Sequence, residues 1–190
     1  MSDLDIPTTD TDERADKEEG FLRWFGELVV LVALAFILAM GIKTFVVQPF
    51  IIPSGSMIPT LEINDRVLVN KFIFRFRQPA RGDVVVFISP DSAGVDYIKR
   101  VVAVAGDTVD IRDGKVYVNG RPLVELYVGD KVTTPGTVAM PLKVPAGRVF
   151  LMGDNRPDSH DGRYFGVQPD SKLLGKAFVR YWPLSRLGTL

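Results

Sequence analysis

The feature that most constrains this chain is a long apolar run near its N-terminus. Residues 28–42 are apolar without interruption, and with Lys43 and the four residues after it the run reaches Val47, 20 residues in all. As a helix, a segment of this length spans about 30 Å, which matches the hydrocarbon core of a bilayer. The run therefore predicts one membrane-spanning helix, and we place this anchor at residues 21–48.

Two other interpretations of the run stay open. A cleaved signal peptide has a basic leader and a small-residue cleavage site, whereas this leader is acidic and no clean site follows it. A buried core helix is the second alternative, although helices that are apolar on every face are rare in small domains. Arg14, Lys17 and Arg23 precede the span and only Lys43 lies at its other end, so the positive-inside rule favours a cytoplasmic N-terminus.

Charge divides the chain into an acidic tail and a basic remainder. Residues 1–20 hold eight acidic and two basic side chains, so residues 21–190 carry a net charge of +6 although the whole chain is neutral. The tail has too little apolar surface to offset its ordering entropy, and we expect it to be disordered. The basic remainder suits a domain beside anionic lipid, and no arginine-rich run or aromatic stacking motif supports a nucleic-acid partner. The chain has no cysteine, which excludes disulfides, a thiol nucleophile and a zinc–thiolate site.

After Pro53 the sequence has the pattern of β-structure. Asp113-Gly114 lies inside an alternating segment and is a strong hairpin signal, and Asn119-Gly120 predicts a further turn. No helical period of useful length follows the apolar run. We expect a mostly β fold, an antiparallel sheet preceded by one N-terminal transmembrane helix. The strands are predicted from runs of branched and aromatic residues at 67–69, 84–88, 97–104, 149–152 and 173–182.

The first candidate for chemistry is the segment PSGSMIPTL at residues 53–61. Two prolines and a glycine bracket two serines, so the backbone is stiff at both ends and can turn sharply between them. Such a turn can present a hydroxyl outward and aim backbone N–H groups at one point, which are the two requirements of acyl transfer. A polar linker between the anchor and the domain is the alternative.

A serine nucleophile needs a base, and the sequence offers two. His160 is the sole histidine and would complete a triad of Ser56, His160 and Asp161, but neighbouring residues of an extended chain point to opposite faces, so Asp161 is badly placed to orient His160. Lys99 lies in an apolar strand, where burial disfavours its charged form and lowers its pKa. A lysine that simply extends to solvent is the alternative.

The segment at residues 152–166 is dense in polar side chains and glycines. A metal loop is the competing interpretation, but the alternate-residue acids of a calcium loop are missing because Arg156 stands at a ligand position. We therefore expect no metal and no cofactor. The ligands of such a metal loop would be Asp154, Asp158, His160 and Asp161.

Four segments, in this order after an anchor, resemble the motif boxes of the bacterial type I signal peptidases. They are PSGSMIPTL (53–61), RGDVVVF (81–87), DYIKRVVAVAGD (96–107) and MGDNRPDSHDGR (152–163), and the resemblance runs on to the C-terminal YWPLSRLG. It implies a membrane-bound serine endopeptidase that removes N-terminal signal peptides from exported preproteins. Cleavage would follow small residues, at sites of the Ala-x-Ala type, by a Ser/Lys dyad and an acyl-enzyme.

The resemblance also implies a role for individual residues. Ser56 would be the nucleophile and Lys99 the general base. The Ser54 hydroxyl and the Ser56 N–H would form the oxyanion hole, and Ser159 would orient the lysine. The remaining positions are a structural ion-pair cluster of Arg100, Asp161 and Arg163, and the walls of the substrate pockets at Phe50, Ile52, Leu61, Val86, Tyr97 and Ile98.

The chain departs from the family pattern in three places. Gly162 stands where some members have serine, and His160 lies at a position without a role in the pattern. The stretch between Gly106 and Met152 is short, so we expect the large second β domain of some relatives to be missing or reduced.

The resemblance implies an organisation in the bacterial plasma membrane. We expect a disordered acidic cytoplasmic tail at 1–20, the transmembrane anchor at 21–48 and an extracytoplasmic β-rich peptidase domain at 49–190. The expected partners are membrane lipid and the signal peptides of preproteins emerging from the export translocon. A pilin-type processing peptidase with the same dyad, or a non-catalytic membrane-anchored β binding module, are the alternative functions.

Overall fold

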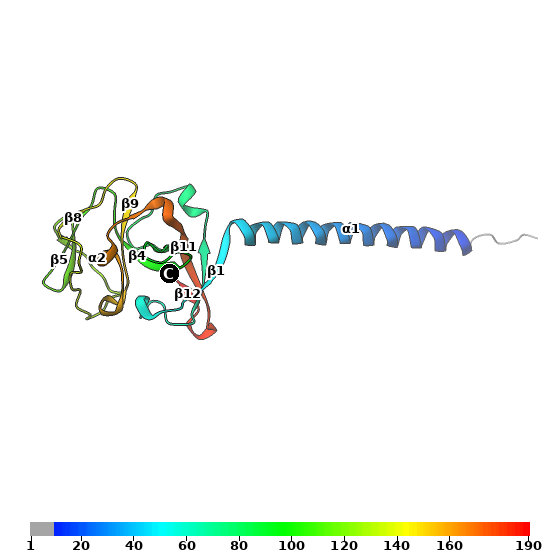
Figure 1. Cartoon of the computed structure of the whole chain (residues 1–190). Helices are drawn as coiled ribbons and strands as arrows, with labels where there is room; N and C mark the ends of the chain where they lie inside the picture. The colour runs from blue at the N-terminus through cyan, green and yellow to red at the C-terminus, as the bar shows by residue number, and fades with distance from the viewer. Residues whose placement is uncertain (1–9) are drawn as a thin grey trace, which may run out of the picture. The chain divides into compact units, whose positions relative to one another are not determined.

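The computed structural model describes the backbone of residues 10–190 and the side chains of residues 23–41 and 46–190. The chain divides into two units, with the boundary between Thr44 and Phe45 (Figure 1). The first contains one long helix and the second contains all the strands.

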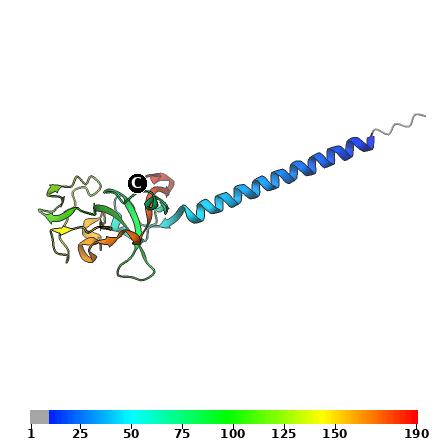
Figure 2. The same cartoon turned by 90° about the horizontal axis from the view of Figure 1, so that it is seen from above.

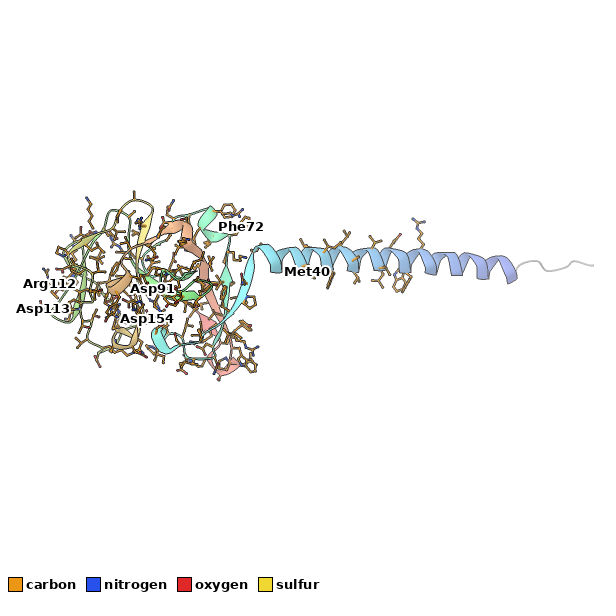
Figure 3. All side chains as sticks on the ribbon, in the orientation of Figure 1. Met40, Phe72, Asp91, Arg112, Asp113 and Asp154 are labelled. Atoms are coloured by element: carbon orange, nitrogen blue, oxygen red, sulfur yellow. The ribbon has the colours of Figure 1, made fainter. Side chains whose placement is uncertain are left out.

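Helix α1 extends from Asp10 to Phe45. Its stretch Arg23–Gly41 has a mean hydropathy of 2.2 and no buried side chain, and it is long and apolar enough to cross a membrane. Figure 3 shows Met40 projecting from this helix. The structure therefore contains the apolar N-terminal helix that the sequence predicts, with its apolar side chains exposed.

The helix differs from the predicted boundaries at both ends. Residues 10–20 were expected to be disordered but are helical; this stretch lacks proline and holds three glutamates with one alanine, one arginine and one lysine, all good helix formers. The rest of the predicted tail, residues 1–9, lies outside the described residues. At the other end Val47 and Gln48, which we placed in the anchor, begin strand β1.

The strand-containing unit is built on an eight-stranded antiparallel sheet (Figure 2). Its middle strands β3, β4 and β9 are rich in valine, isoleucine and phenylalanine, which suit a sheet with both faces covered, and β11 beside them carries leucine and aromatic residues. In sheet order the strands are β1 (Val47–Ile51), β2 (Arg66–Asn70), β11 (Leu173–Trp182), β3 (Val84–Ile88), β4 (Asp96–Val104), β9 (Arg148–Met152) and β10 (Gln168–Pro169), with β12 (Gly188–Thr189) paired to β11.

The chain between β4 and β9 forms a small second sheet of four antiparallel strands. Asp113 and Gly114 connect its central hairpin with positive φ angles of 52° and 74°, as the sequence predicts for a two-residue turn. Figure 3 labels Arg112 and Asp113 at this hairpin. In sheet order the strands are β7 (Arg121–Pro122), β6 (Lys115–Val118), β5 (Thr108–Arg112) and β8 (Leu142–Lys143).

Short helical turns connect the strands. Three of them, η1, η3 and α2, carry residues of the candidate site. The turns are η1 (Gly55–Met57), η2 (Ile73–Arg75), η3 (Arg156–Asp158), α2 (Gly162–Phe165), η4 (Asp170–Lys172) and η5 (Leu184–Arg186).

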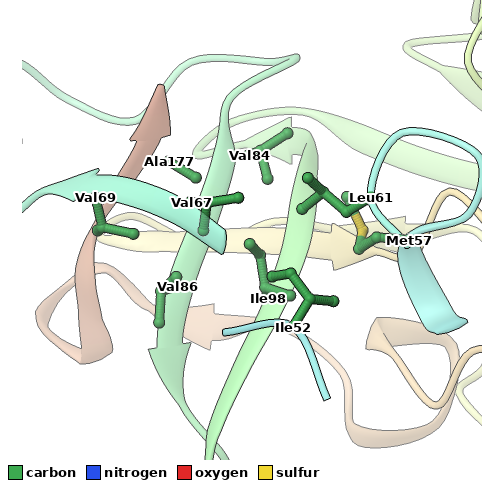
Figure 4. Packing of buried hydrophobic residues seen from close by; sticks show 9 residues of the cluster. All are labelled: Ile52, Met57, Leu61, Val67, Val69, Val84, Val86, Ile98 and Ala177. Atoms are coloured by element: carbon green, nitrogen blue, oxygen red, sulfur yellow. The ribbon is translucent and has the colours of Figure 1, made fainter. Parts of the chain in front are cut away.

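Strand β4 supplies side chains to three hydrophobic clusters. Ile98 packs in the first cluster, Val101 in the second, and Val102 and Ala103 in the third, which also contains the small sheet's valines. Because β4 is covered on both faces, the side chains in the middle of this strand point into the protein interior whichever face they lie on. Figure 4 shows the first cluster, formed by Ile52, Met57, Leu61, Val67, Val69, Val84, Val86, Ile98 and Ala177.

The prediction of a mostly β, antiparallel fold behind one apolar helix is confirmed. Strands β3 and β11 coincide with the predicted runs 84–88 and 173–182. Branched and aromatic residues mark these strands because their side chains fill the pleated, buried surface of the sheet.

We predict that Gly175→Ala destabilises the fold. A Cβ at Gly175 would lie 2.5 Å from Asn70 O and 2.7 Å from Val69 Cγ1, so the close approach of β11 to β2 excludes a methyl group. Overpacking of this kind costs about 1–3 kcal/mol in the free energy of unfolding, measurable by denaturant titration of the protein in detergent. Gly188→Ala is the matched control, because a Cβ there meets its nearest atom, Arg186 O, at 3.9 Å; equal stability of the two variants would contradict the packing argument.

Candidate active site

The serine candidate lies in a tight turn that is fixed on the hydrophobic core. Ser54 is extended, with φ −140° and ψ 161°, and the η1 turn closes with a 3.1 Å bond from Ile58 N–H to Gly55 O. Met57 is fully buried in the first hydrophobic cluster. Because Met57 is fixed in the core, the adjacent Ser56 is held beside it and is only 8% exposed.

Lys99 reaches this serine from the middle of the sheet. Strand β4 pairs Lys99 with Val85 of β3, and its side chain is buried at 4% exposure. Lys99 Nζ donates to Ser56 Oγ at 2.7 Å and to Ile98 O at 3.1 Å. The fold therefore brings together two side chains 43 residues apart in the sequence.

Burial lowers the proton affinity of the Lys99 amine below that of a lysine in water. Desolvation lowers the pKa of Lys99 from 10.5 to about 8, while the carboxylates of Asp161 and Asp154 act against this and raise it. Desolvation has the larger effect because the amine lies among apolar strands.

A cavity of about 360 Å³ opens beside the pair. It holds the serine and lysine side chains, apolar walls from the start of β4, and two carboxylates. Its lining residues are Pro53, Ser54, Gly55, Ser56, Val95, Asp96, Tyr97, Ile98, Lys99, Asp158 and His160.

Two buried carboxylates near the lysine are each paired with an arginine. Arg100 binds Asp154 through Nε at 2.9 Å and a terminal nitrogen at 2.6 Å, and Arg163 Nε binds Asp161 at 2.8 Å. Asp161 also accepts the Gly153 N–H at 3.0 Å. All three residues of the predicted cluster, Arg100, Asp161 and Arg163, are ion-paired, and Asp154 is the partner of Arg100. Figure 3 labels Asp154 in the interior of the β unit.

Several residues of this buried network were missed by the sequence analysis. Arg156 is 1% exposed and pairs with Glu125, whose carboxylate also accepts a 2.8 Å bond from Tyr127. The Tyr127 ring lies 4.0 Å from the Arg100 guanidinium carbon. Glu125 and Tyr127 lie outside every motif of the sequence, so only the fold identifies them. Arg156 was noted only as a residue that breaks a calcium pattern.

His160 does not form the triad that we considered. Its ring lies on the rim of the cavity, bonded through Nε2 to Asp91 at 2.8 Å and stacked on Tyr164. Asp161 is fully buried and accepts bonds from Arg163 and Gly153, not from His160. Neighbouring residues on an extended backbone point apart, which is the reason that Asp161 cannot orient His160.

The same partners argue against the metal loop. Asp154 and Asp161 are each neutralised by an arginine, and His160 is bonded to Asp91. Within residues 23–41 and 46–190, no group of three or more ligating side chains is placed to hold a metal ion.

Ser159 lies next to the serine turn without a bond to the lysine. Its Oγ is a buried side-chain atom without a hydrogen-bond partner among the described residues. A Cβ on Gly153 would collide with Ser159 Oγ and lie 2.5 Å from Ser56 O, so only glycine fits between these two groups. The predicted contact from Ser159 to Lys99 is therefore not formed in this structure.

The predicted pocket residues fall into two sets. Tyr97 and Ile98 line the cavity. Ile52, Leu61 and Val86 are at most 2% exposed and belong to the first hydrophobic cluster, and Phe50 packs against that cluster. They form the packed layer next to the serine turn rather than the walls of the cavity.

Residues 25–182 match the model of the family described as signal peptidase, peptidase S26. The chain belongs to this family. It is 44% identical over 169 residues to the probable signal peptidase I-2 of Synechocystis sp., an alignment that covers 86% of this chain and 76% of that protein. It is 41% identical over 171 residues to signal peptidase I of Leptolyngbya laminosa, covering 86% and 83% of the two chains.

A solved signal peptidase I from Enterococcus faecalis V583 is 33% identical, with a TM-score of 0.47 over 53% of this chain and 97% of the other. Membership of the family, with named relatives over most of its length, makes this protein a serine peptidase of the signal peptidase I type.

We predict that Asp161→Ala destabilises this peptidase strongly. The substitution leaves the buried Arg163 without its carboxylate, and breaking a buried ion pair from one side costs about 3–5 kcal/mol in the free energy of unfolding. Asp110→Ala is the control, because the Arg112–Asp110 pair is half-exposed and surface pairs contribute about 1 kcal/mol or less. Denaturant unfolding of both variants measures the difference, and a loss at Asp161 no larger than at Asp110 would contradict the assignment of a structural role.

Proposed function

We propose that this protein is a membrane-bound signal peptidase that cuts with a dyad of Ser56 and Lys99. The observation that carries the proposal is the 2.7 Å contact between Lys99 Nζ and Ser56 Oγ on the wall of a cavity, with the amine buried and its pKa lowered to about 8. At that pKa a substantial fraction of the amine is neutral near pH 8 and can accept a proton.

The reaction begins when the neutral amine of Lys99 takes the proton of Ser56. Ser56 Oγ then forms a bond to the scissile carbonyl carbon, and the carbonyl electron pair moves to its oxygen. Collapse of this intermediate breaks the peptide bond, and Lys99 returns the proton to the leaving amine. Water, deprotonated by Lys99, hydrolyses the acyl-enzyme and restores Ser56.

The negative oxygen of the intermediate needs donors, and the serine turn offers them. Ser54 lines the cavity, and its side chain does not cap the η1 turn, so its hydroxyl is available to a substrate oxygen. The Ser56 backbone N–H is the second proposed donor. Donors fixed before the reaction stabilise the oxyanion without a reorganisation cost.

Ser159 is proposed as the residue that orients Lys99. Its hydroxyl is buried beside the serine turn and free of other bonds among the described residues, which leaves it available to the lysine amine. Arg100, Asp161 and Arg163 are proposed as structural support for the same loop.

The cavity walls favour small substrate residues. Tyr97 and Ile98 are bulky side chains on the wall, and Ile52, Leu61 and Val86 pack in the hydrophobic cluster that holds the serine turn. We therefore propose cleavage after small residues, at sites of the Ala-x-Ala type, with Phe50 at the edge of the same surface.

Helix α1 is proposed as the membrane anchor, with the N-terminus in the cytoplasm and the peptidase domain on the other side of the plasma membrane. The support is the exposed apolar stretch Arg23–Gly41 and the bases that precede it. The substrates would then be signal peptides that emerge from the export translocon into the lipid beside the domain.

We predict that Ser56→Ala and Lys99→Met each abolish cleavage of a labelled preprotein by the purified full-length protein in detergent. Each removes one half of a chemical unit, and such losses are not additive, so the double variant should be no worse than either single one. His160→Ala is the control and should keep most of the activity, because His160 is bonded to Asp91 on the rim. Circular dichroism checks folding, and normal cleavage by a folded Ser56→Ala or Lys99→Met variant would exclude the dyad.

We predict that kcat/KM rises with pH up to about 8 and is level above it. The active form carries neutral Lys99, whose pKa desolvation lowers to about 8, so the active fraction falls about tenfold for each pH unit below that value. A profile from pH 5 to 11 measures this limb. A limb near the ordinary lysine pKa, or one that disappears in His160→Ala, would contradict the assignment of the base.

A further inference from the structure

Asn155 holds the peptide that carries the serine from the opposite side of the turn. Its backbone N–H donates to Ser56 O at 3.0 Å, and its side-chain Nδ2 donates to Gly55 O at 3.0 Å. The two bonds join segments 100 residues apart in the sequence. Asn155 therefore binds two successive carbonyl groups of the serine turn.

The Gly55 carbonyl and the Ser56 N–H belong to one peptide unit, which is trans. In a trans peptide the C=O and N–H bonds are coplanar and point in opposite directions. A donor that fixes the direction of Gly55 O therefore fixes the direction of the Ser56 N–H as well. A hydrogen bond to the carbonyl also polarises the unit and makes its N–H a stronger donor.

The backbone around Asn155 is itself held firmly. Asp154 before it is fully buried and bound by Arg100, and Arg156 after it is 1% exposed and bonded to Gly153 O at 3.0 Å. The Asn155 carbonyl accepts the Asp158 N–H at 2.9 Å. The side-chain amide of Asn155 therefore acts on the serine turn from a rigid base.

We propose that Asn155 is a positioning residue of the oxyanion hole, which aims the Ser56 N–H at the oxyanion through the Gly55 carbonyl. This inference rests on the proposed dyad mechanism. Asn155 does not line the cavity, and its effect is confined to the transition state and the tetrahedral intermediate because only there does the carbonyl oxygen carry the negative charge.

A second side chain provides a matched control for a purely structural role. Lys131 Nζ donates to Ile58 O at 2.8 Å, so it also binds a carbonyl of the segment that carries the serine. That carbonyl belongs to the peptide between Ile58 and Pro59, which has no N–H and does not include Ser56. Lys131→Met removes a bond of the same kind without affecting the proposed oxyanion donor.

The test compares Asn155→Leu, Asn155→Ala and Lys131→Met in the full-length protein with a signal-peptide substrate. Leucine keeps the approximate size of asparagine without the amide donor. Alanine is the second variant, in case leucine disturbs folding. Both substitutions leave the backbone bond from Ile58 N–H to Gly55 O in place. Loss of a whole oxyanion donor costs about 10²–10³ in kcat, so a misaimed donor should lower kcat by about 10- to 100-fold. We expect KM and the pH limb of Lys99 to stay unchanged, and Lys131→Met to keep kcat within about twofold.

A second measurement distinguishes an effect on the direction of the Ser56 N–H from an effect on the folding stability of the protein. When a peptide aldehyde binds, Ser56 Oγ adds to the aldehyde carbon. The carbonyl electron pair passes to the oxygen and the serine proton passes to Lys99, so that an oxyanion lies in the oxyanion hole. The corresponding peptide alcohol binds the same cavity without an oxyanion. We expect the Asn155 variants to lose affinity for the aldehyde by the same factor as kcat/KM and to bind the alcohol as the unmodified protein does.

The outcomes distinguish this inference from the proposed function. Normal kcat in Asn155→Leu and Asn155→Ala, with Ser56→Ala inactive and Ser54→Ala impaired, would overturn the inference and leave the dyad intact. Equal losses of kcat in the Asn155 and Lys131 variants would also overturn it, because they would show a structural role. Normal cleavage by Ser56→Ala and Lys99→Met would remove the proposed function itself.

Discussion

The buried contact between Lys99 Nζ and Ser56 Oγ is the interaction on which the rest of the site depends. An amine can act as a base near neutral pH only if it is kept out of water, and at 4% exposure Lys99 meets that condition. Its burial requires a strand covered on both faces, which β4 is, with clusters of hydrophobic residues on each side. The antiparallel sheet therefore both positions Lys99 and provides the burial that the amine needs to act as a base.

The same burial creates an electrostatic difficulty that the arginines reduce. Asp154 and Asp161 lie close enough to raise the pKa of Lys99, which opposes its role as a neutral base. Arg100 and Arg163 bind these carboxylates directly and offset their negative charge. The paired arginines thus hold the loop that carries Asn155 and Ser159 while limiting the field that the carboxylates exert on the amine.

Sequence patterns predicted the parts of the fold that depend on local chemistry. The strands of branched residues at β3 and β11 and the Asp113-Gly114 turn were predicted with correct positions, because side-chain shape and positive φ angles are properties of a few adjacent residues. The bounds of α1 differ from those expected for the tail and the anchor, since helix ends depend on which competing bonds the neighbouring chain offers. Gln48 joins a strand because Val69 lies opposite to pair with it.

For the site, the sequence by itself determined which residues can carry the chemistry: a serine in a stiff turn, a lysine in an apolar strand and a polar loop after β9. Only the tertiary structure decided which of them meet. It placed Lys99 rather than His160 on Ser56, paired Arg100 with Asp154 and Arg163 with Asp161, and gave Glu125 and Tyr127 a place in the buried network. The physical reason is that a contact between residues tens of positions apart is set by strand order and register. Those depend on the packing of the whole sheet and not on any one segment.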